Sequence, residues 1–303
     1  MKVFKSLNHN PDLSLALGFF DGVHLAHQKL ISHAVDFAKE NSKKSAVITF
    51  ETNPSNYFRK DKVHNISANE ERLERIEALG VDFAYVLDFE EFMQMEALEY
   101  LEDVLVKSFS PCCIVTGFNH KFGRAREGDT KLLAKYAEKF NYKYIELPAQ
   151  KIQNCLISSS NIRDMILNGH IRNANLLLGH SFSIKNNVVK GNMLARKLGY
   201  PTANIFWPNN IMHLPHGVYF GYVTVDKTYP AVINWGKKPT FGEDGEEVLE
   251  AHILNFDSKI YGKIIKVMFL MKIREEIKFP DFDTLRKQIE EDVQTVMKLS
   301  RLS

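Results

Sequence analysis

The sequence lacks any run of 18 apolar residues, the length that a membrane-spanning helix needs, and its start carries no apolar segment with a small-residue cleavage site. We therefore expect a cytosolic protein with no membrane partner. Cysteine is also scarce: Cys112, Cys113 and Cys155 are the only three. Adjacent cysteines make a poor disulfide pair, so we expect three buried, free thiols.

An excess of one charge is absent as well. The formal net charge is +2, from 39 Lys and Arg against 37 Asp and Glu, and the two signs are interleaved along the chain. Without a basic stripe, nucleic acid is not an expected partner. The chain also has no internal repeat. Its 303 residues, with 45% hydrophobic and 25% charged residues, are typical of a soluble globular protein of two domains.

The first part of the chain, to about residue 180, alternates short apolar runs with longer amphipathic segments. Strands separated by helices of this length predict a parallel sheet with right-handed crossovers, an α/β domain whose ligands bind at the carboxyl ends of the strands. Apolar runs predict strands at 13–19, 45–50, 83–89 and 111–117, and helical spacing predicts helices over 27–41, 69–80, 96–109 and 130–140.

The pattern changes near residue 180, after two short helices that Gly169 and Gly179 end. Residues 181–273 contain about six strand-like runs separated by Gly, Pro and Asn turns, which predict a small all-β barrel. A last helix, from about Phe282 to Leu299, has one apolar face and should pack on that barrel. We therefore predict two domains, 1–180 and 181–303.

Two histidines, His24 and His27, follow a predicted strand and the turn Gly18-Phe19-Phe20-Asp21-Gly22. We expect both at the start of a helix and on one of its faces. Three roles are open: a metal site, a phosphate site or packing. A metal needs a third ligand, and none has a suitable spacing. A helix start after a Gly-rich turn favours phosphate, since its first N–H groups are unpaired.

Three segments of the first part carry a family pattern: GFFDGVHLAH at 18–27, TGFNHKFGRAREGD at 116–129 and ISSSNIR at 157–163. The first resembles G-x-F-D-G-x-H-x-G-H, and the others resemble the G-x-D/N-F-x-F-G-x-x-R-x-G and I-S-S-T-x-I-R motifs. Together they resemble the bacterial bifunctional riboflavin kinase/FMN adenylyltransferases, the FAD synthetases. The resemblance implies a Rossmann-like nucleotidyltransferase domain that joins FMN to the adenylyl group of ATP and releases pyrophosphate.

The resemblance also implies roles for residues of these motifs. His24 and His27 would be catalytic, donating to the phosphates while charge develops on the α-phosphate. Ser158 and Ser159 at a helix start, with Arg163 one turn later, would bind the β- and γ-phosphates. The expected ATP-binding residues of this domain are Gly18, Phe19, Asp21, Gly22, Asn119, Ser158, Ser159 and Arg163.

The second part carries riboflavin kinase motifs: VVKGNMLARKLGYPTANI at 188–205, INWGKKPTF at 233–241, LEAHILNF at 249–256, IYGK at 260–263 and IREEIKF at 273–279. The resemblance implies phosphorylation of riboflavin by ATP, with Glu250 as the base that accepts the ribityl proton. Mg²⁺ prefers oxygen ligands, which Thr202 and Asn204 would supply. Gly191, Arg196 and Pro201 would bind ATP, and Asn234 and Arg274 would bind flavin.

The sequence departs from the family pattern at several positions. Ala26 replaces the glycine of H-x-G-H, and its methyl group occupies space close to the nucleotide. Residues 51–55 replace the usual F-x-P-H-P, and Ala195 replaces a glycine in the kinase phosphate loop. Two alternatives therefore remain beside the bifunctional enzyme: a chain with one activity and one scaffold domain, and a flavin-responsive regulatory protein. The oligomeric state is not decided by the sequence.

Overall fold

The computed structural model describes residues 1–191, 194–237 and 247–302, and the chain divides into two compact units, Met1–Ser159 and Ser160–Ser303. The P-T-F end of the motif at 233–241 lies outside the described residues.

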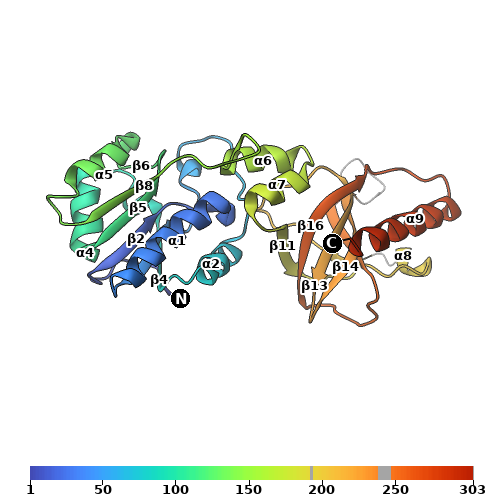
Figure 1. Ribbon diagram of the computed structural model, residues 1–303. Helices are drawn as coiled ribbons and strands as arrows, with labels where there is room; N and C mark the ends of the chain where they lie inside the picture. Colours follow the sequence, from blue (N-terminus) through green and yellow to red (C-terminus); the bar gives the residue numbers. More distant parts are fainter. Residues whose placement is uncertain (192–193, 238–246, 303) are drawn as a thin grey trace. The chain divides into compact units, whose positions relative to one another are not determined.

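The first unit is built on a parallel sheet of six strands in the order β1-β4-β3-β2-β5-β8 (Figure 1). The four strands expected from apolar runs are present, so the predicted parallel α/β architecture is confirmed. The two edge strands were not expected, because β1 has only three residues and β8 is half exposed. The strands are β1 (Lys2–Phe4), β2 (Leu13–Leu17), β3 (Lys44–Phe50), β4 (Phe83–Leu87), β5 (Cys113–Gly117) and β8 (Lys143–Leu147).

Helices cover both faces of this sheet. Alternate residues of β2 face opposite sides: Leu15 and Leu17 belong to one apolar cluster, and Ala16 belongs to another with α1. The predicted helix at 96–109 is present, but its middle is wound as a π-helix. The elements are η1 (Asp21–Val23), α1 (Leu25–Glu40), η2 (Pro54–Tyr57), α2 (Asn69–Ala78), η3 (Phe89–Glu91), α3 (Ala97–Glu99), η4 (Tyr100–Val106), α4 (Lys107–Phe109), η5 (Arg124–Arg126) and α5 (Thr130–Tyr136).

Two short antiparallel pairs complete the first unit: β6 (Lys121–Phe122) with β7 (Gly128–Asp129), and β9 (Lys151–Ile152) with β10 (Cys155–Leu156). All three cysteines are free, as expected. Only Cys113 is buried, however. Cys112 precedes β5 and Cys155 lies in the β9/β10 pair, where both remain partly exposed, so the expected burial of these two was wrong.

The second unit contains the six strands expected from the pattern, in one antiparallel sheet of order β11-β16-β13-β14-β15-β12. A further bridge between Val189 and Asn204 brings the chain after β11 to the opposite edge strand, so the sheet curls into the expected barrel-like form. The strands are β11 (Phe182–Asn187), β12 (Ala203–Ile205), β13 (Gly217–Thr224), β14 (Thr228–Lys237), β15 (Glu247–Ile253) and β16 (Ile264–Arg274).

In the described part of the chain from residue 159 on, the helices are α6 (Ser159–Leu167), α7 (Ile171–Leu178), α8 (Leu194–Lys197) and α9 (Phe282–Ser300). The last confirms the expected C-terminal helix, and it packs beside β14 through the buried Val296 (Figure 1). Gly169 and Gly179 have positive φ where α6 and α7 end. By their contacts, α7 and most of α6 belong to the second unit, which begins at Ser160. The boundary predicted from the sequence pattern lies later, near residue 180.

Candidate functional site

The first candidate site lies where the strand order of the parallel sheet reverses. From β2 the chain proceeds to β3 and β4 on one side, whereas β5 and β8 lie on the other. In such sheets the carboxyl ends of the two strands at the reversal open a crevice for a ligand. The turn at 18–23 follows β2, and the turn that contains Asn119 follows β5, so two predicted binding segments meet at this edge.

The turn after β2 has an uncommon backbone. Phe20, Gly22 and Val23 have φ values of 58°, 73° and 40°, in a region that a β-branched residue such as Val23 rarely adopts. Burial of the Phe20 and Val23 side chains, each 1% exposed, holds the turn in this form. Strain of this kind persists where packing fixes it, and it is concentrated at ligand sites.

His24 and His27 lie together but not as expected. His24 has extended backbone and is the N-cap of α1, so the prediction that both residues share a face of that helix was wrong. Its Nδ1 accepts a hydrogen bond from the backbone N–H of His27 at 3.3 Å, and the two rings stack with centroids 3.5 Å apart. A neutral ring that accepts at Nδ1 carries its proton on Nε2, which makes Nε2 a donor.

Two polar groups tie this turn to neighbouring segments. The Asp21 carboxylate is buried and accepts hydrogen bonds from the backbone N–H groups of Ile66, at 3.0 and 3.1 Å, and Ser67. The Ser159 hydroxyl donates to the Asp21 carbonyl at 3.2 Å. The structure thus brings Ser159 to the histidine turn, with Ser158 directly before it, while Arg163 lies one turn further along α6 in the second unit.

Asn119 is exposed in the turn after β5, where His120 N–H donates to the Gly117 carbonyl at 3.0 Å. The Asn119 amide oxygen lies beside Gly117, since a Cβ at that glycine would be 3.6 Å from it. Burial lowers the pKa of His120 to about 4, so its ring is neutral near pH 7, and it stacks on Phe122. The turn after β5 therefore presents the exposed amide of Asn119, with a neutral imidazole next to it in the chain.

The second candidate site is a row of residues across three strands. Asn204 on β12 pairs with Glu250 on β15, and Glu250 pairs with Asn234 on β14. Paired residues on adjacent strands have side chains on the same face of the sheet. The predicted metal ligand, base and flavin-binding residue therefore lie side by side, although they are far apart in sequence.

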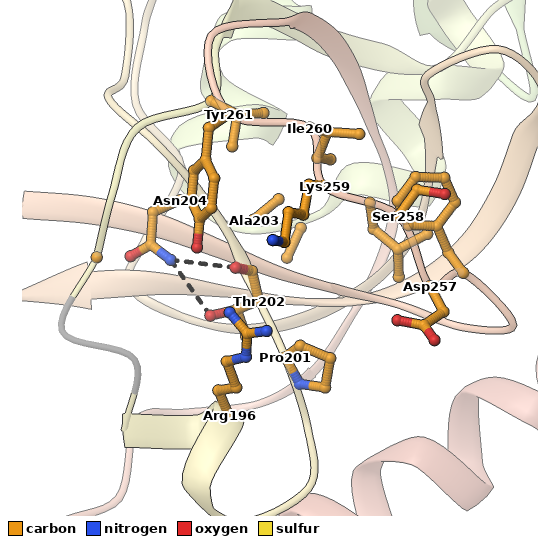
Figure 2. A pocket seen from close by; sticks show the side chains of 15 residues that line it. Arg196, Pro201, Thr202, Ala203, Asn204, Asp257, Ser258, Lys259, Ile260 and Tyr261 are labelled. Atoms are coloured by element: carbon orange, nitrogen blue, oxygen red, sulfur yellow. Dashed lines mark hydrogen bonds between the residues drawn. The ribbon is translucent and has the colours of Figure 1, made fainter.

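A cavity of about 260 Å³ opens at the end of this row, next to Thr202 and Asn204. It is also lined by Gly191, Arg196 and Pro201, so the five predicted nucleotide and metal residues of this unit share one cavity. Figure 2 shows Thr202 held by the Asn204 amide, whose Nδ2 donates to Thr202 Oγ1 at 3.2 Å. Gly191 lies against this amide, since a Cβ there would be 2.3 Å from Asn204 Oδ1.

Arg274 lies further along the sheet, on β16, and its guanidinium binds α9. Its Nε and Nη2 donate to the buried carboxylate of Asp292 at 3.0 and 2.7 Å, and its Nη1 donates to the Glu275 carbonyl at 2.9 Å. Three of the five N–H groups of the guanidinium make these bonds, and the other two do not take part in them. Flavin binding by Arg274 thus remains a prediction, and the observed contacts show that the residue joins β16 to α9.

The comparisons with known proteins decide the family. Residues 6–161 match the FAD synthetase family model, and residues 178–300 match the riboflavin kinase family model. A bifunctional riboflavin kinase/FMN adenylyltransferase of Buchnera aphidicola subsp. Schizaphis graminum is 33% identical, with 100% of both chains covered. One from Bacillus subtilis is 34% identical and covers 94% of this chain and 91% of the relative. The chain belongs to this bifunctional family.

Membership of the riboflavin kinase/FMN adenylyltransferase family confirms the enzyme class and the role in FAD biosynthesis that the motifs implied. A crystal structure of a macrolide-efflux protein from Streptococcus pneumoniae, 30% identical, aligns over 98% of this chain and 99% of its own, with a TM-score of 0.86. Among the described residues, no helix combines the length and the apolar composition that a membrane-spanning segment needs.

Sequence reasoning missed several residues of the cavity beside Thr202 and Asn204. Lys259 and Tyr261, in the loop after β15, line it together with Asp257, and Figure 2 shows the Lys259 ammonium and the Tyr261 hydroxyl directed toward its centre. His252 Nδ1 lies 2.8 Å from the Pro201 carbonyl. Burial lowers the pKa of His252, so a neutral ring donates this bond and holds the Pro201–Asn204 segment. The E-x-H pattern of β15 was the available signal.

The adenylyltransferase unit has one buried residue that sequence reasoning also missed, Arg72 on α2. Its guanidinium reaches the carbonyls at the ends of β2 and β3. The signal was its spacing, because Arg72, Ile76 and Leu79 recur at i, i+4 and i+7 on the apolar face of the helix.

Proposed function

We propose that the second unit phosphorylates riboflavin to FMN at the cavity beside Thr202 and Asn204, and that the first unit adenylylates FMN at the histidine turn. The observation that carries the proposal is the row Asn204, Glu250 and Asn234, which places a carboxylate beside the proposed metal ligand Asn204, a residue that also lines the cavity. ATP, riboflavin, FMN and FAD fit these activities as substrates and products.

The kinase reaction follows from this row. The ribityl hydroxyl of riboflavin attacks the γ-phosphorus of ATP, the bond to the β-phosphate oxygen breaks, and ADP leaves. Glu250, partly exposed in mid-strand, would accept the hydroxyl proton. Arg196, which lines the cavity, would neutralise phosphate charge, and Asn234 would orient the flavin. In this arrangement the protein supplies position and charge, and the reacting atoms come from the two substrates.

Mg²⁺ fits the oxygen atoms beside this cavity. Asn204 Oδ1 is buried and has no hydrogen-bond partner among the described residues, although the amide nitrogen of the same side chain is bonded to Thr202. A buried, unsatisfied oxygen next to a threonine hydroxyl suits a hard cation. When bound there, the ion would neutralise the phosphate charge of ATP. Thr202 and Asn204 would hold it, and Val189, whose N–H donates to the Asn204 carbonyl, would fix the strand behind them.

Replacing Asn204 by Ala tests this assignment. We expect the Mg²⁺ concentration for half-maximal FMN formation to rise at least about tenfold, since one oxygen ligand is lost, on the order of 1.4 kcal/mol. Titration of Mg²⁺ at fixed ATP measures it. Asn187→Ala, at the exposed end of β11, is the control and should leave the titration unchanged. An unchanged titration for Asn204→Ala would remove Asn204 from the metal site.

Replacing Gly191 by Ala tests how closely the loop must approach Asn204. A Cβ would lie 2.3 Å from Asn204 Oδ1, so either the loop or the amide must move. We expect FMN formation to fall at least about tenfold, in line with the loss that small misplacements cause. FAD formation from added FMN, which the first unit would catalyse, is the internal control. Wild-type FMN formation by Gly191→Ala would show that this close approach is not needed.

The adenylyltransferase reaction is assigned to the histidine turn. A phosphate oxygen of FMN attacks the α-phosphorus of ATP, the bond to the β-phosphate breaks, and pyrophosphate leaves. His24 and His27 would donate to the α-phosphate, where charge develops, and Asn119 would hold a phosphate at the neighbouring strand end. Ser158, Ser159 and Arg163 would hold the leaving pyrophosphate. The backbone of Gly18, Phe19, Asp21 and Gly22 would line the nucleotide path, with Asp21 acting through the contacts that shape the turn.

Product analysis separates the two sites. Riboflavin with ATP should release ADP from the second unit, whereas FMN with ATP should release pyrophosphate from the first. If no pyrophosphate forms from FMN and ATP, the first unit is a scaffold and the protein is a riboflavin kinase only. We also propose a functional boundary near residue 180, from the change of sequence pattern there, a cytosolic location, from the lack of long apolar runs, and no nucleic-acid partner, from the interleaved charges.

A further inference from the structure

Arg72 is a buried guanidinium that no motif of the family resemblance includes. It lies on α2 and its side chain is 1% exposed. Its Nη1 donates to the Phe19 carbonyl at 2.8 Å, and its Nη2 donates to the Phe50 carbonyl at 2.6 Å. One side chain on a helix therefore joins the ends of β2 and β3, at the edge of the sheet where the nucleotide is proposed to bind.

The contacts of Arg72 bear on the shape of the histidine turn. Its guanidinium carbon lies 4.3 Å from the centroid of the Phe19 ring, so the charge stacks on the side chain whose carbonyl it also binds. Thr49 Oγ1 donates to the same carbonyl at 3.0 Å. Phe19 is thus fixed from both its ring and its carbonyl, immediately before the positive-φ residues Phe20 and Gly22.

The charge of Arg72 is retained at a cost. Its bonded partners are neutral carbonyls, and its Nε is buried without a hydrogen-bond partner among the described residues. Burial lowers the pKa of Arg72 to about 10, against the opposing effect of the Asp21 carboxylate, so the group is still charged near pH 7. A buried cation bound mainly to neutral groups costs stability, and such costs are typical of functional sites.

The Asp21 carboxylate anchors the same region from the other side. It accepts N–H groups from Ile66 and Ser67, directly before α2, while Arg72 on α2 reaches back to Phe19. Asn69 adds a bond from its Nδ2 to the Glu51 carbonyl at 2.8 Å. The turn and the N-terminal part of α2 therefore form one fixed unit, with the positive charge of Arg72 beneath the backbone that precedes His24.

We propose that Arg72 is a positioning residue for adenylyl transfer: it fixes the Phe19 carbonyl so that the turn presents His24 to the α-phosphate. This inference rests on the proposed adenylyltransferase site. A group that positions the imidazole for the transition state affects kcat more than it affects KM for ATP.

The test compares Arg72→Met and Arg72→Lys in the full-length protein, with FMN and ATP as substrates. We expect Arg72→Met to lower kcat of FAD formation at least about thirtyfold while KM for ATP rises less than about threefold, with partial recovery in Arg72→Lys, which keeps the charge and one donor. Riboflavin phosphorylation by the second unit, measured on the same preparations, is the internal control. Its rate should stay within about twofold of wild type.

Arg75→Met is the matched control on the same helix. Arg75 is partly buried and binds Glu71 at 3.1 Å, so its loss also weakens α2 without touching the turn. FAD formation by Arg75→Met should stay close to wild type. Equal losses in Arg75→Met and Arg72→Met would overturn the inference in favour of helix stability alone, as would wild-type FAD formation in Arg72→Met. A wild-type protein that makes no FAD would instead overturn the proposed function.

Discussion

Glu250→Gln lowers FMN formation by about 10²–10⁴-fold while FAD formation from added FMN continues at the wild-type rate. Glu250 lies between Asn204 and Asn234 on adjacent strands, and a glutamine of the same size cannot accept the ribityl proton. Loss of a general base costs about 10²–10⁴-fold in rate. Chromatographic rates with riboflavin and, separately, with FMN measure both activities on one preparation.

Glu247→Gln on the same strand is the control for this experiment. Glu247 binds His216 Nε2 at 3.0 Å at the start of β15, three residues from Glu250, and has no assigned catalytic role. Its substitution should leave FMN formation within about twofold of wild type. If Glu250→Gln instead lowered both activities together, the assignment of separate sites would be wrong.

His24→Asn lowers FAD formation about 10²–10³-fold and leaves riboflavin phosphorylation intact. His24 is both the N-cap of α1 and the residue proposed to donate to the α-phosphate. Asparagine is a good N-cap but lacks the imidazole, so this variant removes the proposed chemistry and retains the cap. Steady-state rates with FMN and ATP measure the loss.

Two further variants interpret that result. His24→Ala should show the same loss of FAD formation and, in addition, about 1 kcal/mol lower stability in denaturant, because the cap is gone as well. His33→Asn, exposed on the same helix, should change neither quantity. Wild-type FAD formation by His24→Asn would mean that His24 only caps α1, which is the packing alternative that the sequence left open.

The parallel sheet and the antiparallel sheet could both be predicted because their central strands are continuous apolar runs bounded by turn residues. The edge strands β1 and β8 could not, since three residues, or a half-exposed run, give no periodic signal. The π-helical winding of residues 100–106 could not be predicted from the spacing of apolar residues either, because it depends on how the segment packs.

The site was predictable only as far as motifs extend. Thr202 and Asn204 line one cavity with Gly191, Arg196 and Pro201, whose motif is a single segment of the chain that ends in β12. The position of His24 outside α1 depends on the φ values of the turn before it, which tertiary packing imposes. Arg72 was missed because charged helix residues are usually solvated, and only the tertiary fold shows that its partners are the carbonyls of Phe19, in the turn after β2, and Phe50, at the end of β3.

The most direct test of the central claim is a time course of the purified protein with riboflavin, ATP and Mg²⁺, with the flavins separated by chromatography. The account predicts that FMN appears first and that FAD follows from it in the same reaction. Accumulation of FMN without FAD would contradict the adenylyltransferase site at His24. Riboflavin that remains unchanged would contradict both sites and favour a flavin-responsive regulatory protein.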